Sequence, residues 1–245
     1  MAANGTVLAV LAVIFLATLI RSAFGFGEAL VAVPLLALVI PVAVAAPLAV
    51  LVSITVAGVV VVQDWHHVHF GSAWRLVLAT LVGIPLGVLL LTAVAEQVVK
   101  AILAIVIIAF SVYCLVRRSP LVLRDDRLAW LFGFGAGVLG GAYGMNGPPL
   151  VVYGALRRWS AEHFRATLQG YFLPASLAGM AGYWLAGLWV PAVTRYYLLS
   201  LPLAVAAVFL GRVVNRRLDG RRFLRYVHSG LVGVGTALVI QSLRR

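Results

Sequence analysis

The sequence predicts an all-α polytopic integral membrane protein, a bundle of helices, and three observations support that prediction. Of its 245 residues, 63% are apolar and only 11% are charged, whereas an average soluble domain has about 25% charged residues. The mean hydropathy is +1.08. The apolar residues form long runs separated by short polar stretches. A soluble core of this size cannot bury so much apolar surface and keep a wetted exterior, so the composition excludes a soluble enzyme and a disordered chain.

Ten apolar segments follow one another along the chain, and we expect each to be a helix. A helix that crosses a membrane needs about 20 mostly apolar residues, or somewhat fewer where the bilayer thins. The first two segments are short, and so are the sixth and the seventh. In chain order the segments are 5–20, 29–43, 45–62, 74–95, 98–116, 128–142, 147–156, 167–188, 194–211 and 227–243.

Each half of the chain opens with two short segments joined by a glycine-rich break. The first break is the stretch 21–28 and the second is the stretch 140–149. At an offset of 119 residues, the sequence AFGF that starts at Ala23 coincides with AYGM that starts at Ala142. We therefore expect an internal duplication in which each repeat is a broken or hairpin helix followed by three spans. The two repeats are 1–119 and 120–245.

The distribution of basic residues favours an inverted arrangement of the two repeats. If each short pair is a hairpin that enters and returns on one side, fourteen of the 19 basic residues fall on one side and four on the other, with Arg21 inside the first hairpin. If each pair is one broken span, the basic residues divide eight against ten. Cytoplasmic loops are enriched in Lys and Arg, so we expect inverted repeats with both chain ends outside the cytoplasm. The sequence leaves open whether each hairpin is re-entrant or a pair of short full crossings.

The two breaks predict a binding site for a small anion. Irregular backbone at membrane depth is costly unless it is buried in protein or lines a wet cavity. An interrupted helix leaves N–H groups without partners, and their dipoles attract an anion. Glycines there allow positive φ and close approach of the backbone to a ligand, although small residues also serve close helix packing. The expected substrate-binding residues are Arg21, Ser22, Gly25, Gly27, Gly144, Asn146, Gly147 and Pro148.

Arg21 and Glu28 are the most informative charges, because ionisable residues inside apolar spans are rare and usually functional. They are seven residues apart, which is two turns of a continuous helix, so one interpretation is a buried ion pair. In the other, Arg21 binds the anion through charge-assisted hydrogen bonds. Glu28 is then a proton carrier, because removal from water favours the protonated form of a carboxyl group. The sequence leaves both interpretations open.

Other functions fit the sequence less well. The net charge of +12 is typical of nucleic-acid binding, but the basic residues lie in short clusters between apolar runs, so we expect no nucleic acid. His66, His67 and His69 lack a second carboxylate or a cysteine to complete a metal site, and we expect neither a metal nor another cofactor. An intramembrane enzyme needs a nucleophile and a base within reach of each other, and no serine–histidine pairing is indicated. A structural or assembly subunit is the remaining alternative.

Three stretches of the chain are similar to motifs of one known family. The stretch 25–28 followed by Pro34 is similar to a glycine-rich stretch with a downstream proline, and 144–150 resembles a glycine–glycine–proline–proline motif. The stretch 83–87 resembles a recurrent third-helix pattern. On these motifs, and over nearly the whole chain, the sequence resembles the TauE/SafE family of sulfite and organosulfonate exporters, which are small bacterial anion permeases.

The resemblance implies a secondary transporter and no enzyme. It implies export of sulfite, an organosulfonate or a related sulfur-containing organic acid by alternating access, across the bacterial inner (cytoplasmic) membrane. The expected partners are the small anion, the lipid bilayer and protons as a coupling ion, and the oligomeric state stays open, a homodimer included. Glu28 and Asn146 depart from the family pattern, because glycines are usual at both positions. The acidic residue favours either proton coupling or a different substrate.

Overall fold

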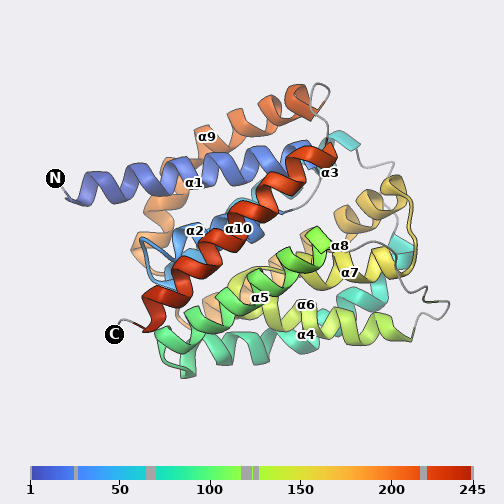
Figure 1. Cartoon of the computed structure of the whole chain (residues 1–245), viewed down its shortest axis with the longest axis horizontal. Coiled ribbons are helices and arrows are strands. Elements are labelled where there is room, and N and C mark those ends of the chain that lie inside the picture. The colour runs from blue at the N-terminus through green and yellow to red at the C-terminus, as the bar shows by residue number, and fades with distance from the viewer. Residues whose placement is uncertain are drawn as a thin grey trace.

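The chain is a bundle of helices with no strand among the residues that the structure describes (Figure 1). The computed structural model describes the backbone of residues 2–24, 27–64, 70–116, 123, 127–215 and 220–243. Within these ranges it leaves out the side chains of 2–4, 24, 60–64, 70–73, 161–162, 165–166, 169, 212, 214–215 and 220–224. The histidine-rich segment 65–69 lies outside the described residues.

The helices confirm the all-α prediction, and each one overlaps one of the ten apolar segments. Among the described residues, six helices are long and apolar enough to cross a membrane, namely α1, α3, α4, α5, α9 and α10. Helices suit such segments because every backbone polar group finds its partner within the helix. The helices are α1 (Ala2–Phe24), α2 (Glu28–Leu36), α3 (Val42–Asp64), α4 (Phe70–Ala93), α5 (Glu96–Val116), α6 (Leu128–Tyr143), α7 (Gly147–Leu156), α8 (Ala161–Leu185), α9 (Pro191–Asn215) and α10 (Gly220–Leu243).

The helices α6 and α7 form a hairpin whose two outer ends lie close together. With 10 residues, α7 is about 15 Å long, half of the roughly 30 Å of a bilayer's hydrocarbon core. Its last residue, Leu156, accepts a hydrogen bond of 2.9 Å from the backbone N–H of Leu123, and Arg157 donates one of 3.2 Å to the carbonyl of Leu123. Because Leu123 precedes α6, the end of α7 returns to the face from which α6 starts. We call this face, with residues 123 and 156–160, the loop face.

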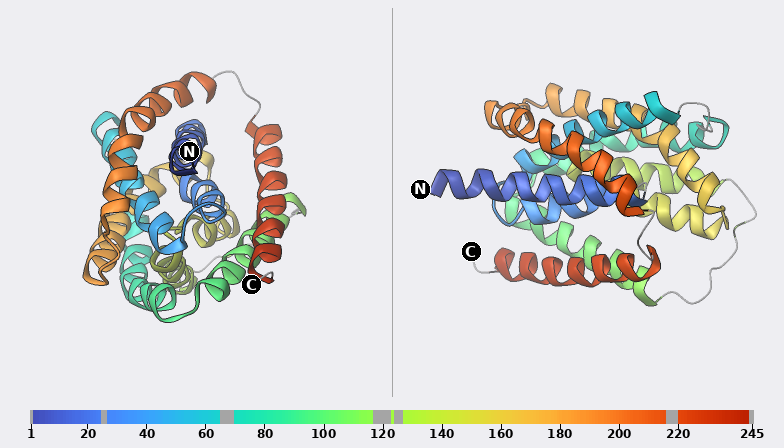
Figure 2. Two further views of the ribbon diagram at one scale, coloured as in Figure 1. Left: turned by 90° about the vertical axis from the view of Figure 1, so that its left-hand side faces the viewer. Right: turned by 90° about the horizontal axis from the view of Figure 1, so that it is seen from above.

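The helices α1 and α2 form the second hairpin, at the other end of the bundle. α2 has 9 residues and is too short to cross. The loop 37–41 that follows it lies beside residues 95–97 and 241–242, and both termini lie at this same end of the molecule (Figures 1 and 2). We call this end the termini face. The α1–α2 hairpin thus turns back to the termini face and the α6–α7 hairpin to the loop face, and the inverted duplication stays a prediction.

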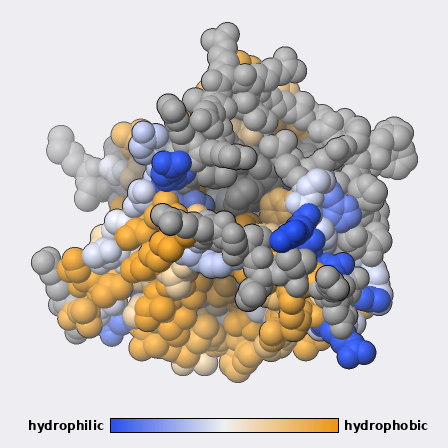
Figure 3. Space-filling view, turned by 45° about the vertical axis from the view of Figure 1, so that its right-hand side comes forward, coloured by the Kyte–Doolittle hydropathy of each residue, from blue (hydrophilic) through white to orange (hydrophobic). Residues whose placement is uncertain are grey.

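On the side of the bundle that Figure 3 shows, hydrophobic side chains cover most of the lower part of the surface, while hydrophilic ones lie above it and towards the right-hand edge. Many large apolar residues are exposed on the long helices, among them Leu89 on α4 and Ile105 on α5. A soluble protein would not expose so many, whereas lipid chains cover them without cost. The protein is therefore a multi-pass membrane protein, as its composition predicts.

The long helices of one predicted repeat pack mainly against helices of the other. α4 packs along α6, α1 along α9, and α5 along α10, while α8 contacts both α3 and α4. The contact between α4 and α6 is made by backbone, because glycines face each other there. A Cβ atom added to Gly83 would lie 2.9 Å from the backbone nitrogen of Val138, and one added to Gly87 would lie 2.7 Å from that of Ala142. Small residues of this kind allow two membrane helices to approach closely.

Candidate functional site

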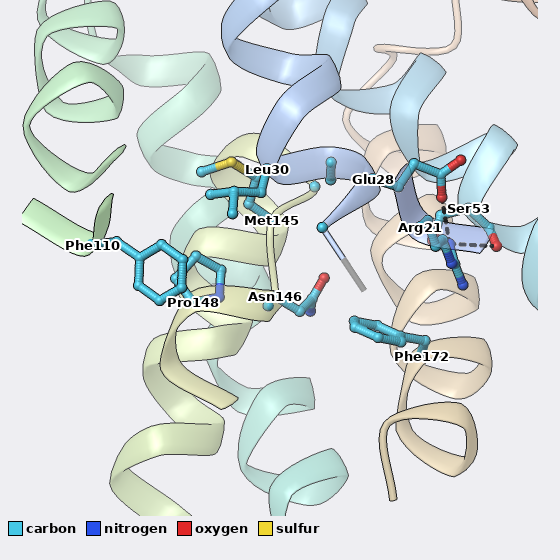
Figure 4. A pocket seen from close by; sticks show the side chains of 13 residues that line it. Arg21, Glu28, Leu30, Ser53, Phe110, Met145, Asn146, Pro148 and Phe172 are labelled. Carbon is cyan, nitrogen blue, oxygen red and sulfur yellow. Dashed lines mark hydrogen bonds and ion pairs between the residues drawn. The ribbon is translucent and has the colours of Figure 1, made fainter. Parts of the chain in front are cut away.

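The two breaks meet at one cavity inside the bundle (Figure 4). The open space inside it is small, with room for about one or two water molecules. Its walls come from the breaks and from three long helices, α3, α5 and α8. The lining residues are Arg21, Gly27, Glu28, Ala29, Leu30, Ser53, Phe110, Gly144, Met145, Asn146, Gly147, Pro148 and Phe172.

In the first break, Gly27 sets the direction in which α2 starts. Its φ of 98° is in the left-handed region, which glycine adopts without the steric cost of a Cβ atom. The first hydrogen bond within α2 runs from the N–H of Val31 to the carbonyl of Gly27, at 3.1 Å. The amides of residues 28–30 precede that bond, so they are the N–H groups that a helix start leaves without helical partners. All three residues line the cavity.

Arg21 and Glu28 form a buried ion pair at this helix start (Figure 4). Their exposed fractions are 8% and 3%. Arg21 also donates to Ser53, at 2.6 Å to Oγ and 3.3 Å to the carbonyl oxygen, and Glu28 accepts a hydrogen bond of 3.1 Å from Thr18. The ring centroid of Phe172 lies 5.3 Å from the guanidinium carbon, a cation–π contact. Each charge therefore has partners, and both still face the cavity.

In the second break, Gly144 ends α6 and Asn146 precedes α7. Gly144 has a φ of 66° and its N–H bonds to the carbonyl of Gly140, which is the αL C-cap motif, while the N–H of Met145 bonds to the carbonyl of Leu139. Asn146 does not cap α7 with its side chain. Its Nδ2 atom instead donates to the hydroxyl of Tyr171 on α8, at 3.3 Å.

Comparison with known proteins decides the family. The sequence model of the sulfite exporter TauE/SafE family matches residues 10–239, which is nearly the whole chain. The chain belongs to the TauE/SafE family. No curated protein and no solved structure matches it. TauE/SafE proteins are transporters and not enzymes, so the intramembrane enzyme is set aside and the protein is an anion permease by family.

Most of the residues that the sequence suggested for binding line the cavity of this TauE/SafE protein. They are Arg21, Gly27, Gly144, Asn146, Gly147 and Pro148, and Glu28, which the sequence suggested as a proton carrier, lines the cavity as well. Gly25 lies outside the described residues. Ser22 is elsewhere: its hydroxyl donates to the carbonyl of Val208 at 2.5 Å, and its Cβ faces Gly211. Because one residue along a helix is a rotation of about 100°, Ser22 faces α9 while Arg21 faces the cavity.

Six residues of the cavity wall were not predicted from the sequence. Three lie in or next to the breaks (Ala29, Leu30 and Met145) and three lie on long helices, namely Ser53, Phe110 and Phe172. A signal was present, because Ser53 and Phe172 are 119 residues apart, which is the offset of the predicted duplication. Equivalent residues of inverted repeats lie at matching depths, so each of these two was a candidate neighbour of the breaks.

Proposed function

We propose that this protein exports a small sulfur-containing oxyanion, such as sulfite or an organosulfonate, across the inner membrane of a bacterium by alternating access. The observation on which the proposal rests is that both breaks line one cavity, which also contains a buried arginine. The family supports a transported anion. The chemistry of the lining residues supports an anion as well, because it combines a guanidinium group with the N-terminal end of a helix.

The binding set of the proposal comes from both breaks. The guanidinium of Arg21 supplies the charge and can bind two oxygens of an oxyanion at once. The amides at the start of α2 supply further donors, and Gly147 leaves room at the start of α7, since no atom of the described residues lies within 4 Å of a Cβ placed there. Asn146 adds a polar group from the second break. Ser22 is not part of this set.

Glu28 occupies the place in which the anion would bind. Glu28 is the first residue of α2, and its carboxylate pairs with Arg21. This carboxylate is therefore a covalently attached anion at the start of a helix. A second negative charge in a closed cavity has a high cost in free energy. We propose that a proton binds to the Glu28 carboxylate when the anion takes over Arg21, so that the cavity keeps its net charge and a proton accompanies the anion.

The function is tested by counterflow of labelled sulfite in proteoliposomes. We expect Asn146→Leu to abolish counterflow while the protein still inserts into the membrane, because an apolar side chain would replace the polar group of the second break. Gln97→Leu is the matched control, since Gln97 is an exposed amide on the termini face. Full counterflow by Asn146→Leu would discard this cavity as the site, and absence of sulfite counterflow by the unmodified protein would discard sulfite as the solute.

The proton role of Glu28 is tested by the pH dependence of anion binding. In the unmodified protein the ionised carboxylate competes for Arg21, so binding should weaken as the pH rises. Glu28→Gln removes the competing charge, and we expect its binding to be tight and independent of pH. Glu96→Gln is the control, because Glu96 pairs with Lys100 outside the cavity. A Glu28→Gln variant with the pH profile of the parent would eliminate the proton role and leave the anion site in place.

A further inference from the structure

A chain of hydrogen bonds with a defined direction holds Asn146. The hydroxyl of Thr80 on α4 donates to the carbonyl of Gly133 at 2.8 Å. A hydroxyl group has one proton, so in the 2.6 Å contact between Thr80 and Tyr171 the tyrosine is the donor. The oxygen of Tyr171 then accepts the bond from Nδ2 of Asn146. The donor and the acceptor of each of these three hydrogen bonds are thereby assigned.

This series of hydrogen bonds leaves the carboxamide oxygen of Asn146 facing the cavity. Thr80 and Tyr171 are fully buried, so water does not compete for their hydroxyls. The amide nitrogen lies over Gly140, where it is the nearest atom to a Cβ placed on that glycine. Figure 4 shows the oxygen of Asn146 pointing into the space between the two breaks. Within the described part of the chain, this oxygen has no hydrogen-bond partner.

The cavity therefore presents donors on one side and an acceptor on the other. An oxyanion that has no donor of its own would leave the oxygen of Asn146 without a partner when water is expelled, which costs free energy. An anion with a hydroxyl group, an amino group or an acidic proton beside its charge would satisfy both sides. Such an anion would place its charge at Arg21 and its donor at Asn146.

We propose that Tyr171 and Thr80 are positioning residues that fix the carboxamide of Asn146 with Oδ1 towards the cavity, so that the site selects anions with a hydrogen-bond donor beside the charged group. This inference rests on the proposed function, because it concerns the same cavity. It makes the selectivity of the site depend on two hydroxyl groups that do not line the cavity.

The direction of the chain predicts a reversal when Thr80 loses its hydroxyl. In Thr80→Val, which keeps the volume of the side chain, Tyr171 has no acceptor on α4 and donates to Oδ1 of Asn146 instead. The carboxamide then turns, and Nδ2 faces the cavity as a donor. Thr80→Ser keeps the hydroxyl and the original orientation. Tyr171→Phe removes the link itself, so neither orientation of the carboxamide is favoured.

The test compares ethanesulfonate with 2-hydroxyethanesulfonate, two permanently charged anions that differ by one hydroxyl group. Each is used to inhibit counterflow of labelled sulfite, and the ratio of their half-maximal concentrations is the readout. We expect the unmodified protein and Thr80→Ser to prefer the hydroxylated anion by roughly threefold to tenfold, the range that one hydrogen bond provides. Thr80→Val should reverse the preference, and Tyr171→Phe should abolish it. Tyr143→Phe should not alter it, because that hydroxyl donates to the carbonyl of Val99.

The ratio separates positioning from a structural role. If Thr80→Val and Tyr171→Phe raise both half-maximal concentrations equally, the residues only support the fold and the proposal is overturned. A preference of the unmodified protein for ethanesulfonate would also overturn it, while leaving the proposed function intact. If Asn146→Leu transports sulfite normally, the cavity itself is not the site, and both proposals fail together.

Discussion

The two breaks have the same form but different charge. At the offset of 119 residues, Arg21 of the first break corresponds to Gly140 of the second, and Glu28 corresponds to Gly147. The first break therefore contains an ion pair where the second has two glycines. A single anion needs one cationic group, and a second buried arginine would add an unbalanced charge. The difference teaches that two breaks of similar form can have different roles, with charge in one and neutral polar contacts in the other.

At one pair of corresponding positions the second break has the polar side chain and the first has a glycine, because Asn146 corresponds to Gly27. A Cβ atom at Gly140 would lie 2.9 Å from Cγ of Asn146. The carboxamide of Asn146 therefore has room only because Gly140, the residue that corresponds to Arg21, has no side chain. The breaks also differ as helix starts. The first turn of α2 has amides at residues 28–30, whereas Pro148 and Pro149 remove two donors from the first turn of α7.

The strongest way to break this comparison is to remove the charge of the first break. We expect Arg21→Gln to lower sulfite counterflow roughly a hundredfold or more, because loss of one partner of a buried ion pair costs about 3–5 kcal/mol. Arg21→Lys should retain part of the activity, since it keeps the charge without the two-pronged geometry. The double variant Arg21→Gln/Glu28→Gln removes both charges and separates lost binding from lost folding. Arg195→Gln, on the exposed surface of α9, is the control, and unchanged counterflow by Arg21→Gln would contradict the assignment.

A second test compares the glycines with positive φ in the two breaks. Gly27→Ala introduces backbone strain of about 1–2 kcal/mol, with only Cγ2 of Ile20 near the new Cβ, at 3.9 Å. Gly144→Ala adds to the same strain an overlap with Val50, whose Cγ2 lies 2.8 Å away, worth about 1 kcal/mol or more. Thermal unfolding in detergent should therefore show a larger loss of stability for Gly144→Ala. Equal losses would indicate that backbone strain alone decides both positions.

The smallest effect is expected at Phe172, which covers Arg21. Phe172→Leu removes the cation–π contact, worth about 1 kcal/mol in a partly desolvated setting, and should raise the half-saturating sulfite concentration roughly fivefold. Phe132→Leu is the control, because that ring packs on Tyr153 away from the cavity. If both variants bind sulfite equally well, the ring of Phe172 does not stabilise the bound state of Arg21.

Much of the fold could be predicted from hydropathy, because in a membrane protein an apolar run and a helix nearly coincide. The two breaks were recognisable by their glycines, and the basic residues favoured the hairpin arrangement over broken spans. The positive φ of Gly27 and of Gly144 followed the expected use of glycine. The site was harder, since the direction of a side chain depends on how a helix is rotated against its neighbours. Ser22 and Arg21 are adjacent in sequence, but only Arg21 faces the cavity.

The contacts of Asn146 show where the sequence has no information. Its partner Tyr171 is 25 residues away, and the partner of that hydroxyl, Thr80, lies on a helix of the other predicted repeat. The pattern of apolar residues assigns each of these residues to a segment of the chain, but it does not predict that their side chains contact one another. Only the crossing of α4, α6 and α8 brings them together. The ion pair of Arg21 and Glu28 was foreseen as one of two interpretations, because both residues lie within one break.

The facing glycines of α4 and α6 have a consequence for how the protein can move. Gly83 and Gly87 precede residue 119, and the helix against which they lie follows it, so this contact joins the two predicted repeats. Parting the two helices would expose backbone surfaces that no side chain can fill, so in the proposed alternating access we expect α4 and α6 to move together. The plane of opening would then cut through both predicted repeats and would not follow the boundary between them.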